Sequence, residues 1–158
     1  MYTNDRKCFM VFKLNSVLLF VMNIQLSDIN QKKTHVTNRK RSKILIIDDN
    51  ESMTKLLSRF FEIKNIQYTI SNDGYAGLQL INEKKFDTIL LDLAMPDFSG
   101  WDIIESLEKQ GKIKEERILV FTASALSPLQ MEELLERGIR GCIKKPVKLE
   151  SLLQVLEV

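Results

Sequence analysis

ILIIDDNES, residues 44–52, runs from four aliphatic side chains directly into two adjacent aspartates. The aliphatic run predicts a buried strand, and the apolar residues of the segment behind it have the spacing of a helix. Burial of Asp48 and Asp49 at the end of such a strand is costly unless a positive charge lies opposite them. The stretch therefore predicts a strand whose carboxyl end carries a charged site.

The same alternation of strand and helix continues to the end of the chain. Strand patterns lie at residues 43–47, 66–70, 86–91, 117–121 and 139–143, and helical patterns follow them at residues 51–63, 76–81, 100–108, 128–137 and 149–156. Pro128 stands at a permitted first-turn position, and Gly138 ends the fourth helix. Five repeats predict an α/β fold, a doubly wound five-stranded parallel sheet in a flavodoxin-like (βα)5 three-layer sandwich.

Charge is unevenly distributed along the chain. The 158 residues have a formal net charge of +2, but residues 1–42 hold eight Lys or Arg and only two Asp, so the remainder is mildly acidic. This balance argues against nucleic-acid binding by the folded part. The two cysteines form no disulfide framework, which favours a reducing, cytoplasmic location.

Residues 1–42 are predicted to form a basic, flexible N-terminal extension. Residues 9–26 are apolar but interrupted, and their clean run at residues 17–22 is much shorter than the ~20 residues that a spanning helix needs. Residues 27–42 are polar and basic, as in a linker. We favour an unstructured or weakly helical extension over a membrane-surface anchor, and we expect no membrane contact by residues 9–26.

Polar residues stand at the carboxyl ends of four predicted strands. Asp48 and Asp49 end the first strand, Asp92 the third, Thr122 the fourth and Lys145 the fifth. The carboxyl ends of parallel strands meet at one edge of the sheet. Clustered carboxylates repel one another unless a cation offsets them, and oxygen ligands favour a hard ion such as Mg²⁺. The sequence therefore predicts a Mg²⁺ site that is aided by Lys145.

The strand ends carry a set of motifs in a fixed order: Asp48-Asp49, Asp92 with Met95-Pro96 and Gly100, Thr122-Ala123, and Lys145-Pro146. In this order they resemble the receiver domain of two-component response regulators, and the resemblance covers residues 43–158. It implies that the Asp92 carboxylate accepts a phosphoryl group from a sensor histidine kinase or a phosphotransfer protein. It also implies that Asp49, Asp92 and the backbone carbonyl of Ala94 bind Mg²⁺ directly, while Asp48 acts through water.

The resemblance assigns the phosphoryl oxygens to Thr122 and Lys145. Lys145 supplies a positive charge, and Thr122 supplies a hydrogen bond that forms only once phosphate is present and so biases the loop behind it. The family usually has Tyr or Phe three residues before this lysine, where the sequence has Cys142. We therefore expect either that Thr122 alone moves the loop or that the output face differs.

Simpler interpretations exist for single residues. Asp49-Asn50 could cap the first helix, Thr122 could be a strand-end turn residue, and Lys144 and Lys145 could be a solvated pair. Asp92 is the hardest to explain in this way, because it interrupts an aliphatic run directly after a core strand.

The leading functional hypothesis is a stand-alone receiver, not an enzyme, that signals by binding an unidentified downstream protein. It rests on the end of the sequence at Val158, directly after the fifth predicted helix. The alternative is an aspartate-nucleophile phosphohydrolase on a similar fold. That enzyme would need a second carboxylate two residues after the nucleophile, where Ala94 stands. A nucleotide-binding domain would need a glycine-rich first loop, which this sequence lacks.

Overall fold

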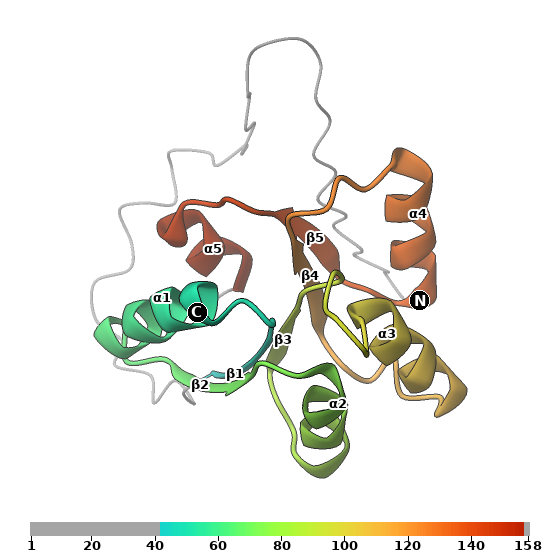
Figure 1. The fold of residues 1–158 in the computed structure, drawn as a ribbon, viewed down its shortest axis with the longest axis horizontal. Coiled ribbons are helices and arrows are strands. Elements are labelled where there is room, and N and C mark those ends of the chain that lie inside the picture. The colour runs from blue at the N-terminus through green and yellow to red at the C-terminus, as the bar shows by residue number, and fades with distance from the viewer. Residues whose placement is uncertain (1–41, 157–158) are drawn as a thin grey trace, which may run out of the picture. The chain divides into compact units, whose positions relative to one another are not determined.

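The computed structural model describes residues 42–156. Strands and helices alternate along this part of the chain (Figure 1): β1 (Lys43–Ile47), α1 (Glu51–Ile63), β2 (Gln67–Ser71), α2 (Gly74–Glu83), β3 (Thr88–Leu91), α3 (Gly100–Lys109), β4 (Ile118–Thr122), α4 (Pro128–Arg137), β5 (Gly141–Lys144) and α5 (Leu149–Leu156). The predicted order of elements is confirmed. Within the described part, no helix has the length and apolar character to cross a membrane. The expected extension and the segment at residues 9–26 lie outside the described residues, apart from Ser42.

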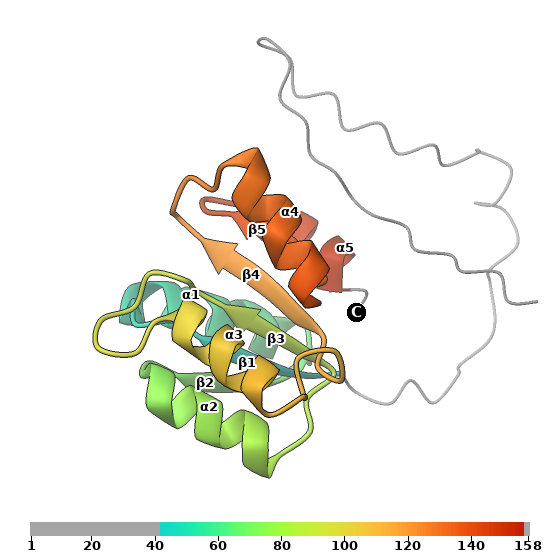
Figure 2. The same ribbon diagram turned by 90° about the vertical axis from the view of Figure 1, so that its right-hand side faces the viewer.

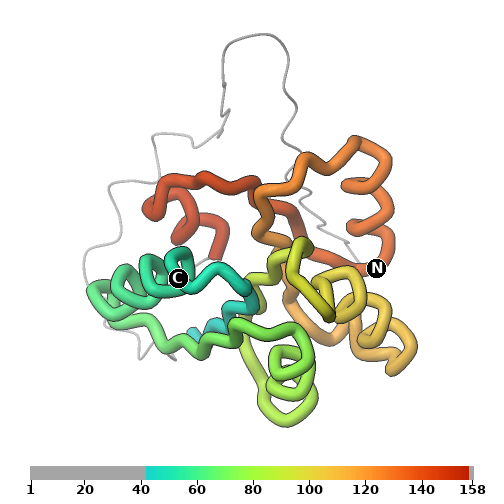
Figure 3. Tube along the Cα trace, viewed as in Figure 1, coloured from blue at the N-terminus to red at the C-terminus, as the bar shows by residue number. Residues whose placement is uncertain are grey.

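The strands form one parallel sheet in the order β2-β1-β3-β4-β5. Ile46 of β1 pairs with Ile70 of β2 on one side and with Leu90 of β3 on the other. Figure 3 follows the chain from β1 out to the edge strand β2 and back past β1 to β3. The strand order therefore reverses between β1 and β3, and open α/β sheets have their functional crevice at the carboxyl ends of such strands.

Helices cover both faces of the sheet. Leu45 and Ile47 of β1 pack in one apolar cluster with α2, α3 and α4, whereas Ile44 and Ile46 pack in a second cluster with α1 and α5. Figure 2 shows α3 in front of the strands and α1 behind them. Successive residues of a strand point to opposite faces, so the aliphatic run of β1 serves both clusters. The predicted doubly wound, three-layer fold is confirmed.

Helix ends follow local sequence signals. The Asn50 side chain accepts a hydrogen bond from the Met53 N–H at 3.1 Å and caps α1. Ser127 caps α4, and Gly138 ends it in the left-handed region at φ 116. The cap on α1 bears on the site, because Asn50 fills the capping position and leaves both preceding aspartates available for other contacts.

Some local expectations are wrong. Leu56 has the spacing of the apolar residues of α1 but is 50% exposed, because other α1 side chains fill the face toward the sheet. Strand β5 begins at Gly141 instead of residue 139, because the Ile139 N–H donates to the Leu134 carbonyl at 3.0 Å and completes the end of α4. Strands β2, β3 and β4 also begin one or two residues later than predicted.

A bidentate ion pair joins α3 to α4. Arg137 donates from Nε and Nη2 to the two carboxylate oxygens of Glu108 at 2.8 and 2.7 Å. This pairing lowers the pKa of Glu108 from its ordinary value of 4.5. A carboxyl group whose pKa is depressed by folding stabilises the protein above its unfolded pKa, and that stabilisation is lost as the pH falls through the folded pKa.

We therefore expect Arg137→Gln to lower the free energy of unfolding by about 1 kcal/mol at neutral pH. The difference from wild type should shrink as the pH falls from 4.5, the ordinary pKa of a glutamate, through the lower pKa that Glu108 has in the folded wild type. Urea unfolding over a pH series measures both quantities. Lys109→Gln is the control, because its pair with Glu105 is mostly exposed and should contribute little. A difference that does not vary with pH would show that Arg137 acts by packing alone.

Candidate functional site

The ends of four strands bring the predicted site residues together. Asp48 follows β1, Asp92 follows β3, Thr122 ends β4 and Lys145 follows β5. Backbone hydrogen bonds hold these positions in line: the Asp92 N–H donates to the Ile47 carbonyl at 2.9 Å, and the Lys145 N–H donates to the Thr122 carbonyl at 2.9 Å. The sheet ladder therefore continues into the site and fixes where each side chain begins.

The Lys145 ammonium group lies between two carboxylates. Its Nζ is 2.6 Å from Asp48 Oδ2 and 2.8 Å from Asp92 Oδ2. The side chains of Lys145 and Asp48 are only 9% and 2% exposed, so water screens this contact poorly. The Phe121 ring, whose centroid is 5.0 Å from Nζ, covers the ammonium group further. The positive charge that the sequence required opposite Asp48 is therefore supplied by Lys145.

Asp49 completes an acidic cluster beside this lysine. Carboxylate oxygens of Asp48, Asp49 and Asp92 lie within 4.8 Å of one another, and Asp49 is exposed. Among residues 42–156, the Asp49 side chain has no hydrogen-bond or ion-pair partner. Three carboxylates facing one ammonium group leave an excess of negative charge, and oxygen atoms are the ligands that hard divalent cations prefer. The residues present therefore fit Mg²⁺.

Asp48 is also fixed by its neighbours. Its Oδ1 accepts a hydrogen bond from the Asn50 N–H at 3.0 Å, and Asn72 Nδ2 donates to its backbone carbonyl at 2.6 Å. Burial raises the pKa of Asp48, and the hydrogen bonds from Lys145 and Asn50 oppose that rise. Sequence reasoning missed Asn72. The available signal was its place directly after β2, the one strand end to which no site residue was assigned.

Ala94 and Thr122 border the cluster. The Ala94 N–H donates to Asp92 Oδ1 at 3.2 Å, and Ala94 is exposed. Thr122 is buried, and its hydroxyl oxygen accepts a hydrogen bond from the Ser124 N–H at 3.2 Å. The hydroxyl therefore already contacts the loop that leads to α4.

Cys142 lies in β5 opposite Val120 of β4. It is half-buried and packs against the apolar cluster that includes α2, α3 and α4. Burial raises the pKa of its thiol to about 11, so the thiol stays protonated at neutral pH. Its surroundings fit a small packing residue and do not favour redox chemistry.

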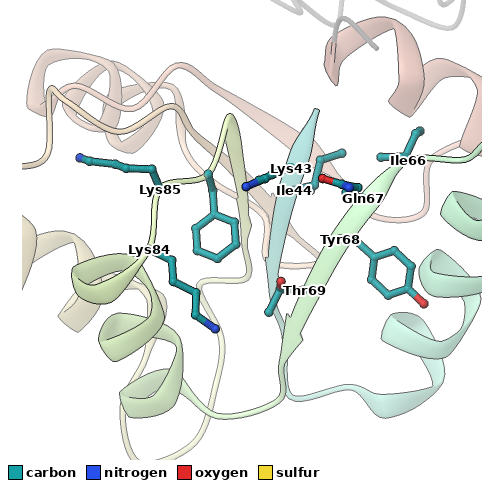
Figure 4. Close-up of a pocket in the computed structure, with 9 residues that line it drawn as sticks. Lys43, Ile44, Ile66, Gln67, Tyr68, Thr69, Lys84 and Lys85 are labelled. Atoms are coloured by element: carbon teal, nitrogen blue, oxygen red, sulfur yellow. The ribbon is translucent and has the colours of Figure 1, made fainter. Parts of the chain in front are cut away.

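A shallow cleft of about 670 Å³ lies at the other end of the sheet (Figure 4). Lys43 and Gln67, the first residues of β1 and β2, line it together with Lys84, Lys85 and residues near them. Parallel strands begin at the edge opposite the one where they end, so this cleft is separate from the acidic cluster. Its lining residues include no carboxylate, so the cleft does not offer the oxygen ligands that the acidic cluster does.

Sequence similarity assigns the chain to a family. Residues 44–157 match the response regulator receiver domain family. The chain belongs to this family. This receiver domain is 28% identical over 119 residues to the chemotaxis protein CheY-3 of Vibrio cholerae, a match that covers 75% of the chain and 91% of the relative.

Other relatives are longer than this receiver domain. It is 30% identical over 115 residues, 73% of its chain, to the sensor histidine kinase RcsC of Salmonella typhi, and it spans 12% of that protein. It is 32% identical over 105 residues, 66% of its chain, to a homologue of the transcriptional regulatory protein CpxR from Haemophilus influenzae, and it spans 44% of that protein.

Solved structures support the same fold. Chemotaxis protein CheY4 of Vibrio cholerae is 27% identical with a TM-score of 0.66, and the match covers 74% of this receiver domain's chain and 97% of CheY4. A response regulator from Burkholderia pseudomallei, solved with a phosphorylated aspartic acid, a calcium ion and citrate, is 29% identical with a TM-score of 0.62. That match covers 73% of this chain and 66% of the Burkholderia chain.

Proposed function

We propose that this receiver domain accepts a phosphoryl group on Asp92 and acts as a protein-binding switch. One observation carries the proposal: the Lys145 ammonium group contacts both Asp48 and Asp92, while Asp49 stands exposed beside them. This arrangement combines an acceptor carboxylate, a fixed positive charge and ligands for a divalent cation. The phosphorylated aspartic acid in the related Burkholderia protein supports the same chemistry.

In the proposed reaction, the P–N bond of a phosphohistidine breaks and a P–O bond to the Asp92 carboxylate forms. Asp49, Asp92 and the Ala94 carbonyl would hold Mg²⁺ directly, with Asp48 acting through water, and the bound ion would supply positive charge opposite the phosphoryl oxygens. Lys145 is near enough to Asp92 to contact the same oxygens after a small movement of its Nζ. The chain's residues therefore contribute alignment and charge, which are the main needs of phosphoryl transfer.

Thr122 is the proposed link to the output. Its hydroxyl oxygen accepts a hydrogen bond from the Ser124 N–H, and its proton could be donated to a phosphoryl oxygen on Asp92. A rotation of the Thr122 side chain toward the phosphoryl group would loosen the bond to Ser124 and shift the loop before α4. With Cys142 in place of an aromatic residue, the movement would rest on Thr122.

A sensor histidine kinase or a phosphotransfer protein is the proposed donor, and an unidentified protein is the proposed target of the switch. The similar proteins are signalling proteins, and we propose no catalytic turnover for this chain. We propose that the reaction takes place in the cytoplasm. We take residues 43–158 as the switching unit and residues 1–42 as a basic extension that precedes it.

Incubation with the small phosphodonor phosphoramidate, with and without Mg²⁺, tests the proposal. We expect one added phosphoryl group per chain, located on Asp92 by mass spectrometry and dependent on Mg²⁺. Rapid release of inorganic phosphate with no stable adduct would instead favour a phosphohydrolase. Absence of any adduct under conditions that phosphorylate a CheY control would contradict the proposal.

Asp49→Ala separates the metal from the fold. In metal-free buffer we expect the variant to melt at a higher temperature than wild type, because one of three crowded carboxylates is removed. The expected gain in unfolding free energy is about 1 kcal/mol. Wild type should gain stability with added Mg²⁺, and the variant should gain almost none. Thermal unfolding over a Mg²⁺ series measures both effects. Glu132→Ala, at an exposed carboxylate on α4, is the control and should respond to Mg²⁺ as wild type does.

A further inference from the structure

The loop between β3 and α3, residues 92–99, carries both Asp92 and Ala94. One side of this loop rests on the first turn of α3. A Cβ atom placed on Gly100 would come within 2.1 Å of the Asp92 carbonyl oxygen, and the Gly100 N–H donates to the Leu93 carbonyl at 3.2 Å. Only glycine allows this approach, so the beginning of the loop is fixed by backbone packing.

The other side of the loop rests on the first turn of α2. A Cβ atom on Gly74 would come within 2.0 Å of the Phe98 carbonyl oxygen. Next to this contact, the Tyr75 ring stacks on the Phe98 ring with centroids 4.1 Å apart and planes at 25°. Asp97, which directly precedes Phe98 in the loop, has a φ of 60, so the loop bends sharply here.

Burial alone does not account for Tyr75, which is 56% exposed. The first turn of α2, which carries Tyr75, is also connected to the acidic cluster by hydrogen bonds. Asn72 donates to the Asp48 carbonyl, and the Ser71 hydroxyl donates to the Asp73 carbonyl at 2.7 Å. The start of α2 is therefore tied to Asp48, and the stack ties it to the loop that carries Asp92.

We propose that the Tyr75–Phe98 stack positions the loop after Asp92, so that the Ala94 carbonyl is held ready for the divalent cation. Tyr75 is thus a positioning residue for metal binding, although it lies outside the acidic cluster. This inference rests on the proposed function, because it assigns a cation to Asp49, Asp92 and Ala94. A stacked aromatic pair contributes enough free energy to change an affinity by about two- to ten-fold.

Calorimetric titration of the full chain with MgCl₂ tests the inference. We expect Tyr75→Ala and Phe98→Ala each to raise the Mg²⁺ dissociation constant by about three-fold. The double variant should be no worse than either single variant, because both remove the same stack. Tyr75→Phe keeps the ring and should restore the wild-type affinity, which a role for the hydroxyl group would not allow.

Tyr68→Ala is the matched control. Tyr68 also belongs to an aromatic pair, with its ring 6.1 Å from that of Phe61. Tyr68 lies on the edge strand β2 and Phe61 on α1, and both pack in the cluster with α1 and α5, away from the loop. We expect it to lower the melting temperature while leaving Mg²⁺ affinity unchanged.

The outcomes separate the two claims. Wild-type Mg²⁺ affinity in Tyr75→Ala, or equal weakening by Tyr68→Ala, would overturn the inference and leave the proposed function standing. A wild-type protein that binds no Mg²⁺ would overturn the proposed function and the inference together. Additive losses in the double variant would show that Tyr75 and Phe98 act separately, which also contradicts the proposal.

Discussion

The Asp92→Asn variant is expected to lose all phosphoryl transfer while keeping its fold. An amide nitrogen replaces one carboxylate oxygen at nearly the same volume, so the buried position is filled and the remaining oxygen can still accept a hydrogen bond from Lys145. The neutral amide is not a nucleophile for phosphorus, so no acyl phosphate can form. Mass spectrometry after incubation with phosphoramidate and Mg²⁺ should show a fall from one added group per chain to background.

Asp97→Asn is the control for this variant. Asp97 lies in the same loop, is exposed and has a φ of 60, a conformation that asparagine also tolerates. Its replacement should leave both the fold and phosphorylation unchanged. A phosphorylated Asp92→Asn protein, modified on another carboxylate at the wild-type rate, would remove Asp92 from its proposed role.

Lys145→Met should cause the largest loss of stability among single substitutions in the site. The methionine side chain fills similar space without charge, so Asp48 and Asp92 lose the ammonium group that contacts both of them. An uncompensated buried carboxylate costs about 3–5 kcal/mol of unfolding free energy. Urea unfolding in metal-free buffer measures this loss, and Lys144→Met, at the exposed neighbouring lysine, should show almost none of it.

The unfolding free energy of Lys145→Met should also depend on pH, and the pKa of Asp48 determines the direction. Burial already raises the pKa of Asp48, and removal of Lys145 also removes a contribution that opposes this rise. A carboxyl group whose folded pKa lies above its unfolded pKa binds more protons in the folded state, so the variant should gain stability as the pH falls toward the unfolded pKa. Added Mg²⁺ or a second substitution, Asp48→Asn, should also recover part of the loss. A deficit equal to that of Lys144→Met would show that the ion contacts contribute little.

The main architecture was predictable because strand and helix patterns differ in period. Short aliphatic runs such as residues 44–47 are typical of strands in a sheet that is covered on both faces, and parallel pairing then brings every strand's carboxyl end to one edge. That rule alone placed Asp48, Asp92, Thr122 and Lys145 at a common edge.

Side-chain contacts across the site were not predictable in the same way. The sequence indicated that Lys145 lies near the carboxylates, but it did not show that its ammonium group contacts two of them at once. Lys145 is 97 positions from Asp48 and 53 positions from Asp92 along the chain. The stack between Tyr75 and Phe98 depends on a bent loop whose backbone has no periodic signal. Strand boundaries were wrong by one or two residues where helix-end hydrogen bonds compete with the ladder, as they do at Ile139.

The parallel pairing of the sheet has a consequence for how the protein folds. Ile44 of β1 pairs with Thr88 of β3, and none of the strand pairs is a local hairpin, so each one must close a long loop before it gains any contact. Lys145 arrives only when β5, the last strand, docks against β4. Until β5 docks, Asp48 and Asp92 lack the positive charge of Lys145, and hydration of their carboxylates is more favourable than burial. The acidic site is therefore complete only when β5 is paired with β4, and any state that lacks β5 also lacks the ammonium group that contacts Asp48 and Asp92.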